Sequence, residues 1–249
     1  MLLGIMGAMP EEIEKVIGSV QQKQIEEKGS RVYYRGTLFG QEVVAVFSRW
    51  GKVAAATTAT QLIVDYGVDS IVFTGIAGGI SPEASVGDVV IGQRFFQHDM
   101  DARPLMRRFE IPLTGKTSFG TDDYRMEIMS EAVHNFLKKS KDFRQQLQQS
   151  DIANPKMLVG DIASGDLFIS GSDMKKSLIR NLPSVVCAEM EGAAVAQVCD
   201  DYGVPLTVVR VISDVADESA HKGAIDFVSK HAGDYSLGII KEYIALLNC

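Results

Sequence analysis

The sequence alternates short apolar runs, typical of buried strands, with longer stretches typical of amphipathic helices, and this alternation constrains the fold most. Strands are predicted at Leu2–Met6, Val32–Leu38, Glu42–Ser48, Ser70–Thr74, Asp88–Phe95, Met157–Ser164, Ser184–Ala188 and Leu206–Ile212. Helices are predicted from Pro10 onward and at Lys52–Tyr66, Asp123–Lys139, Ser172–Arg180, Glu191–Tyr202 and Gly223–Leu247. Strands separated by helices imply an α/β fold, in which helices flank both faces of a central, largely parallel or mixed sheet.

A chain of 249 residues suits either one large α/β domain or two smaller ones. Its most polar stretch, Lys138–Pro155, is interpreted as a helix end and an exposed connection, because neither flank looks self-sufficient. We therefore predict a single domain over residues 1–249.

The charge balance and the apolar runs exclude several classes of protein. There are 25 Lys and Arg residues against 32 Asp and Glu residues, which gives a formal charge of −7. This acidity argues against a nucleic-acid or anionic-membrane binder, since both normally use basic patches. The longest apolar runs, such as Ile71–Ile80, fall short of the ~20 residues that a membrane span requires. The N-terminus lacks the basic region of a signal peptide, so we expect a soluble, cytoplasmic protein.

Neither a metal site nor a disulfide framework is expected. Cys187, Cys199 and Cys249 are too few and too scattered for either, and they are interpreted as two buried thiols and one at the terminus. The histidines have no metal-ligand spacing, and no cofactor is expected.

Polar residues directly after predicted strands are the candidates for function, because ligands in such sheets bind beyond the carboxyl ends of strands. After the first strand come Glu11 and Glu12, at the start of a helix. They either cap that helix, or one of them faces a cleft as a general base. After the fourth strand, Gly75–Gly79 forms either a tight turn or a backbone surface that a ligand can approach closely.

Two further candidate positions lie in the second half of the chain. Glu189 and Glu191 follow a strand and precede a helix of small residues, so they are either solvated helix-terminal acids or ligands for neighbouring hydroxyls. Arg210 lies within an apolar strand, where a buried charge needs a partner. Asp214 follows that strand, and the Ser213 hydroxyl is placed to donate to it. A turn or cap at Asp214 is the alternative, but the buried arginine favours a functional interpretation.

Taken in order, these motifs resemble the nucleoside phosphorylase/nucleosidase superfamily, and within it the 5′-methylthioadenosine/S-adenosylhomocysteine nucleosidases. The resemblance extends from Gly4 to about Asp217. It rests on seven segments in the family's order and spacing: Gly7–Glu12, Gly51–Ala56, Ala77–Gly79, Val86–Asp88, Ser164–Ile169, Glu189–Glu191 and Arg210–Asp217. One such match could be chance, whereas seven in order could hardly be. The resemblance implies a nucleoside phosphorylase-like fold and an N-glycosidase that needs no cofactor.

The resemblance also implies roles for individual residues. Asp214, supported by Ser213, would protonate purine N7, and Glu12 would activate the attacking water, with Arg210 helping to position it. Glu191 would bind the ribose hydroxyls with help from the Met190 backbone. The remaining implied substrate contacts are Phe168 stacking on adenine, the Ile169 backbone at the edge of the base, Met9 against the sugar and thioether, and Ala77, Gly78, Glu189 and Trp50 in the binding site.

The chain departs from the family at three positions of the implied site. Ile76 stands where well-known members carry Ser, so a hydroxyl that could help to hold the water is missing. Trp50 replaces a smaller apolar residue of the thioether pocket, and Ala224 falls where many members have a bulky one. The segment Met100–Thr114 also matches less well. In the family this region closes the pocket of a neighbouring subunit, so the resemblance implies a homodimer.

Three alternatives to this hydrolase remain open on the sequence. In a phosphorylase, phosphate would attack in place of water, but the acids near the first loop would repel phosphate, and Arg49 is an isolated cation. A related hydrolase would act on another nucleoside, such as futalosine or AMP. A non-catalytic nucleoside-binding protein would have no need of the set Glu12, Glu191, Arg210 and Asp214. The pathway role, methionine salvage or another, is also open.

Overall fold

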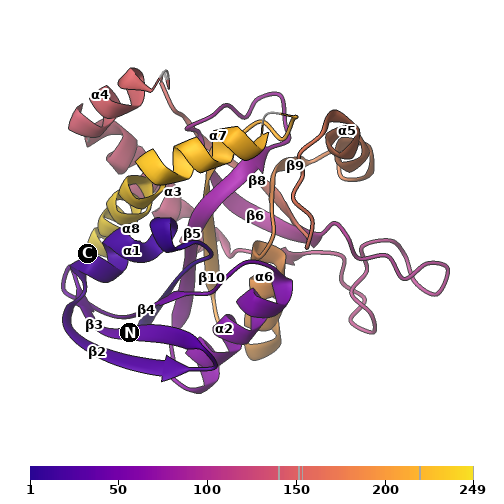
Figure 1. Cartoon of the computed structure of the whole chain (residues 1–249). Coiled ribbons are helices and arrows are strands. Elements are labelled where there is room, and N and C mark those ends of the chain that lie inside the picture. Colours follow the sequence, from indigo (N-terminus) through magenta and orange to yellow (C-terminus); the bar gives the residue numbers. More distant parts are fainter. Residues whose placement is uncertain (140, 151, 153, 219, 249) are drawn as a thin grey trace.

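The structure is a computed structural model that describes every residue except 140, 151, 153, 219 and 249, and Figure 1 traces its elements. The strands are β1 (Leu3–Gly7), β2 (Gln21–Lys28), β3 (Arg31–Leu38), β4 (Gln41–Phe47), β5 (Ser70–Gly79), β6 (Val89–Gln97), β7 (Phe119–Gly120), β8 (Met157–Ser164), β9 (Val185–Glu189) and β10 (Leu206–Asp214). The helices are α1 (Pro10–Ser19), α2 (Lys52–Val64), α3 (Asp123–Lys139), α4 (Lys141–Gln149), α5 (Ser172–Asn181), α6 (Gly192–Tyr202), α7 (Ala220–Phe227), a π-helical turn η1 (Val228–Ala232) and α8 (Gly233–Leu247).

The ten strands form one mixed sheet, which confirms the predicted α/β class. Strand β5 pairs in parallel with β1 and β10 and antiparallel with β9. Because β10 also pairs with β6, β6 with β8, and β8 with β9, these strands close into a ring. The sheet continues from β5 through β1, β4, β3 and β2.

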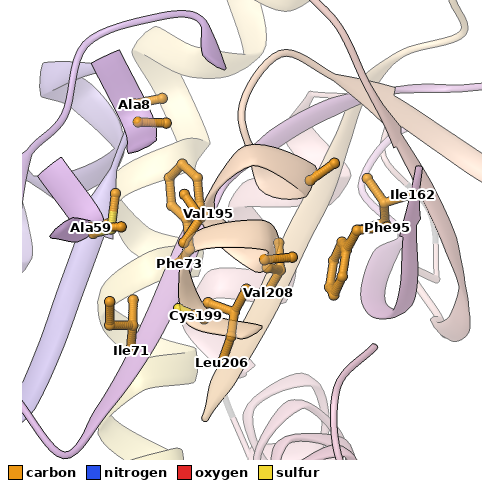
Figure 2. Close-up of a cluster of buried hydrophobic side chains, with 14 of the residues drawn as sticks. Ala8, Ala59, Ile71, Phe73, Phe95, Ile162, Val195, Cys199, Leu206 and Val208 are labelled. Carbon is orange, nitrogen blue, oxygen red and sulfur yellow. The ribbon is translucent and has the colours of Figure 1, made fainter. Parts of the chain in front are cut away.

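Helices cover both faces of the sheet, and each face has its own apolar core. Helices α2 and α6 pack on one face, where Ala59, Val195 and Cys199 meet Phe73 and Val208 of the sheet (Figure 2). Helices α1, α3 and α8 pack on the other face through side chains that include Ile13, Phe136 and Tyr243. Burying each large apolar side chain contributes roughly 1.5–3 kcal/mol. The two cores therefore contribute much of the free energy that stabilises the sheet.

Several sequence predictions need correction. Strand β2 was not predicted, because an edge strand of exposed Gln, Lys and Glu residues shows no apolar alternation. The polar stretch Lys138–Pro155, interpreted as a connection, contains helix α4. The predicted C-terminal helix starts earlier, at Ala220, and is interrupted by the π-helical turn. Strand β5 does not end at Thr74 but continues through the glycines to Gly79.

Three further features concern the pairing of β3 with β4, the cysteines and the length of the helices. The strands predicted at Val32–Leu38 and Glu42–Ser48 correspond to β3 and β4, which form an antiparallel hairpin. Cys187 and Cys199 are buried free thiols, as predicted, whereas Cys249 lies outside the described residues. Within the described part of the chain, no helix combines the length and the apolar character needed to cross a bilayer.

Candidate active site

A pocket with a cavity volume of about 430 Å³ lies where the ends of β1, β5, β9 and β10 meet the loop after β8 and helix α7. It is lined by Ala8, Met9, Glu12, Trp50, Ile76, Ala77, Gly78, Leu167, Phe168, Ile169, Ala188, Glu189, Met190, Glu191, Ser213, Asp214, His221, Ala224, Ile225 and Val228. All of the site residues predicted from the sequence line this pocket except Arg210. Four carboxylates therefore meet in a cavity whose walls are otherwise largely apolar.

Two carboxylates of the pocket lie close to the backbone of strand β5. Residues 70–73 of β5 pair with β1, and residues 78–79 pair with β9. Between these two pairings, a backbone group of β5 binds a side chain: the Ile76 N–H donates to Glu12 Oε1 over 2.9 Å. A Cβ atom on Gly75 would lie 2.7 Å from the same oxygen, and one on Gly78 would lie 3.0 Å from Asp214 Oδ1. A side chain at Gly75 would displace the Glu12 carboxylate, and one at Gly78 would crowd that of Asp214, so glycine lets both carboxylates approach the strand.

Glu12 lies in the first turn of α1, and backbone N–H groups hold it in the pocket. Its Oε2 accepts from Ala8 N over 2.7 Å and from Met9 N over 2.8 Å. Burial raises the pKa of Glu12, while Arg210 and the backbone N–H groups act against that rise. Glu11 is only half-buried and does not line the pocket. Of the two acids at this helix start, Glu12 is the one that lines the pocket, and it also caps the helix.

Glu189 and Arg210 form an ion pair beneath the pocket. Arg210 Nη2 lies 2.7 Å from Glu189 Oε2, and the two side chains are 1% and 3% exposed. Glu189 also accepts from the Ser164 hydroxyl and from Gly192 N at the start of α6, and the guanidinium stacks 4.1 Å from the Phe73 ring centroid. The predicted partner of the buried arginine is therefore a carboxylate of the site, and Arg210 itself supports the pocket wall.

Substituting Arg210→Met should destabilise the protein by about 3–5 kcal/mol, because it leaves the buried Glu189 carboxylate without its counter-charge. Urea unfolding followed by circular dichroism measures the loss. The matched control is Arg103→Met, which breaks an exposed ion pair with Asp101 and should change stability far less. Equal stability losses in the two variants would contradict the structural role of the buried pair.

Glu191 projects into the pocket between Glu189 and the start of α2. Its Oε1 accepts from Gly51 N over 2.8 Å, and Gly51 has a φ of +90°, which favours glycine. Burial and then the neighbouring Glu189 carboxylate raise the pKa of Glu191 to about 8, although Gly51 N–H and Arg210 lower it. Among the described residues, Gly51 N–H holds one oxygen of the Glu191 carboxyl group, and the second oxygen is left to bind a hydroxyl.

Asp214 ends β10 and is fixed at both oxygens. Oδ2 accepts from the Ser213 hydroxyl over 2.7 Å, and Oδ1 accepts from Ala216 N over 2.9 Å. Burial raises the pKa of Asp214, whereas these two hydrogen bonds lower it. A buried carboxyl with a raised pKa can keep a proton and donate it to a bound base.

Aromatic side chains lie at the mouth of the pocket. Phe168 is 45% exposed and Trp50 is 62% exposed, whereas Ile169 beside Phe168 is buried. The Phe168 ring meets His221 of α7 edge-on, with 6.5 Å between the ring centroids. An exposed aromatic face above an apolar pocket is suited to stacking on a planar base.

Sequence reasoning missed part of the pocket wall. His221, Ile225 and Val228 line the pocket beside Ala224, from α7 and the π-helical turn. Their spacing of three and four residues places them on one helix face, and this pattern could have indicated a shared surface. Nothing in the sequence indicated that this face points to the site. The described residues contain no cluster of three or more His, Cys, Asp or Glu side chains able to hold a metal ion.

The chain belongs to the Phosphorylase superfamily, whose family model matches residues 2–245. Among solved structures it is similar to the 5′-methylthioadenosine/S-adenosylhomocysteine nucleosidase of Neisseria meningitidis in complex with methylthio-immucillin-A, with 28% identity, a TM-score of 0.85 and 98% of each chain covered. The corresponding nucleosidase of S. pneumoniae, with a transition-state inhibitor, is 29% identical with a TM-score of 0.85, over 99% of this chain and 100% of that one. The predicted resemblance and the predicted fold are therefore confirmed.

A futalosine hydrolase is similar to a comparable degree. The enzyme from Helicobacter pylori is 28% identical with a TM-score of 0.84, over 98% of this chain and 97% of that one. Overall similarity therefore does not separate the two substrate classes, and the choice between them depends on the pocket.

Proposed function

We propose that the chain hydrolyses the N-glycosidic bond of 5′-methylthioadenosine and S-adenosylhomocysteine, releasing adenine and the 5-thioribose. The placement of Glu12 and Asp214 in one pocket carries this proposal. Both side chains line the same cavity, and they approach β5 beside different residues, Glu12 at Gly75 and Asp214 at Gly78. In this proposal the base–ribose bond lies between a water held by Glu12 and the acid at the base.

Cleavage of this bond builds positive charge on the ribose and negative charge on the base. Asp214 donates its proton to N7 of the leaving adenine, and Glu12 takes a proton from the attacking water. The Glu191 oxygen that Gly51 does not occupy accepts from the ribose hydroxyls, beside Met190. Carboxylates around the ribose favour the cationic transition state, since each acts where the charge develops.

The other pocket residues hold the two ends of the substrate. Phe168 stacks on adenine, and the backbone of Ile169 contacts the edge of the base. Ala77 and Gly78 line the pocket from β5, while Met9 and Trp50 pack against the sugar and the 5′-thioether. No cofactor takes part in this proposal.

The composition of the wall supports water rather than phosphate as the nucleophile. Among the described residues that line the pocket, none is Lys or Arg. A phosphate dianion would therefore find no lysine or arginine counter-charge in this wall, and its burial there would carry a high desolvation cost. Arg210 lies below the wall and is already paired with Glu189.

A panel of substrates tests the proposal. We expect the pure protein to release base fastest from 5′-methylthioadenosine and S-adenosylhomocysteine, and slowly or not at all from futalosine, inosine and AMP. Chromatography of the free base gives the rates. Fastest release from futalosine would establish the second candidate function, which the similarity to the H. pylori enzyme favours. Release from none of them would indicate a non-catalytic binder.

We also propose that the protein is a cytoplasmic homodimer that acts in methionine salvage. Large apolar side chains are exposed at the pocket mouth and on the segment that the resemblance assigns to the neighbouring subunit. Trp50, Leu167 and Ile225 are more than half exposed at the mouth, and Leu105 and Leu113 are 87% and 94% exposed. Association of two protomers through this region would remove these apolar side chains from water.

A further inference from the structure

Lys175 on α5 connects two segments of the active site without lining the pocket. Its side chain is half-buried, and its ammonium donates to Val215 O over 2.6 Å and to Gly79 O over 2.9 Å. Val215 directly follows Asp214 in the chain, and Gly79 directly follows Gly78 on β5. One ammonium therefore ties the loop that carries Asp214 to the strand against which Asp214 lies.

A second contact fixes the same helix to the same loop. Ser172 N, in the first turn of α5, donates to Glu218 Oε1 over 3.2 Å. Helix α5 begins at Ser172, three residues after Ile169, so the chain connects it directly to the base-stacking segment, while its hydrogen bonds connect it to the loop after Asp214. The position of α5 thus couples these two parts of the site.

The loop after Asp214 has a conformation that needs external support. Ala216 has a φ of +52°, a left-handed conformation that costs energy for a residue with a Cβ. Its N–H is the group that donates to Asp214 Oδ1. The flanking Val215 carbonyl is bound by Lys175, which restrains the loop at the residue between Asp214 and Ala216.

We propose that Lys175 is a positioning residue for the general acid: it fixes the loop after β10 so that Asp214 points at the leaving base, and its ammonium is one of the charges that act on that carboxyl. The expected effects on kcat/KM and on its pH dependence rest on the proposed function. The structural part of the inference rests on the contacts of the Lys175 ammonium alone.

The charge of Lys175 affects the pKa of Asp214, and so does the charge of Asp217. Besides burial, which raises the pKa of Asp214, Asp217 on the same loop also raises it, and Lys175 from α5 lowers it. His221 of α7 lines the same pocket. A general acid works only while protonated. Removing the Lys175 charge raises the pKa of Asp214. Because the acid then keeps its proton to higher pH, the alkaline limb of the profile of kcat against pH moves to higher pH.

The test uses the full chain with three variants of Lys175 and one matched control. Lys175→Met removes the charge and both hydrogen bonds, and Lys175→Gln keeps one donor without the charge. Lys175→Arg keeps the charge and provides rescue. The control is Lys176→Met, because Lys176 is the next residue and is exposed, and its ammonium lies 4.0 Å from the exposed Asp173 carboxylate.

We expect Lys175→Met to lower kcat/KM for 5′-methylthioadenosine by about 10- to 100-fold, the size of effect that a small misplacement of a reacting group produces. Lys175→Arg should recover most of this loss, and the control should not show it. In an Asp214→Asn background, Lys175→Met should add no further loss, because the residue acts through that acid. Equal fold-losses in both backgrounds would overturn the proposal.

A second readout does not depend on turnover. The Asp214 carboxyl can be titrated by ¹³C NMR in the substrate-free protein, with its resonance assigned by its absence from the Asp214→Asn spectrum. We expect a higher midpoint in Lys175→Met and Lys175→Gln than in the wild type and in Lys176→Met. An unchanged midpoint would overturn the charge role, even if the protein acted on a different nucleoside. A shifted midpoint without base release would contradict only the proposed function.

Discussion

Asp214→Asn is expected to lower kcat for 5′-methylthioadenosine by about 10²- to 10⁴-fold, the contribution typical of a positioned general acid. The amide can still accept from Ser213 or Ala216, so the loop geometry should largely survive, but it has no acidic proton to give to the base. Steady-state rates of adenine release measure the loss. Asp173→Asn, at an acid whose side chain is fully exposed, provides the control.

The pH dependence of turnover by the wild type also tests Asp214 as the general acid. Because burial raises the pKa of Asp214, the acid keeps its proton further toward neutral pH than an ordinary aspartate. Activity should fall as the pH rises through this pKa, and the alkaline limb should disappear in Asp214→Asn. Near-normal turnover in that variant would eliminate Asp214 as the general acid.

Glu12→Gln is expected to abolish most of the turnover as well, by at least about 10²-fold, because a neutral amide cannot take a proton from water. It should also destabilise the fold. The carboxylate accepts from Ala8, Met9 and Ile76 through both oxygens, so a glutamine must turn its own NH₂ group toward at least one of these N–H donors. Leaving a buried donor unsatisfied costs about 1–3 kcal/mol.

Thermal unfolding and initial rates separate these two effects of Glu12→Gln. Glu11→Gln is the matched control, since Glu11 is the adjacent acid and does not line the pocket. It should keep both stability and turnover. If Glu12→Gln instead retained turnover within about tenfold of the wild type, a role for Glu12 as the base would be untenable.

The sequence predicted the α/β class because buried strands and amphipathic helices have different periods, and most core strands stand out as apolar runs. Strand β2 escaped detection because its side chains are largely exposed and, apart from Ile25, polar. The end of β5 was misplaced for a different reason. Its glycines are typical of a turn, yet they serve a continuing strand that two carboxylates approach closely.

The candidate site was predictable where chemistry depends on residue type and chain position. Glu12, Glu191 and Asp214 each lie at the junction of a strand and the next segment, and such junctions meet at one edge of the sheet. The residues that line the pocket from α7 depend on tertiary packing. His221 carries no local signal, and Lys175 acts through backbone carbonyls of segments distant in the sequence.

The measurement that tests the central claim most directly is the release of adenine from 5′-methylthioadenosine in phosphate-free buffer. The pure protein is incubated with the nucleoside, and the free base and the sugar product are followed by chromatography. We predict adenine and free 5-methylthioribose, at a rate that added phosphate does not raise. A strict requirement for phosphate, with a ribose 1-phosphate as the product, would contradict hydrolysis by a water held at Glu12.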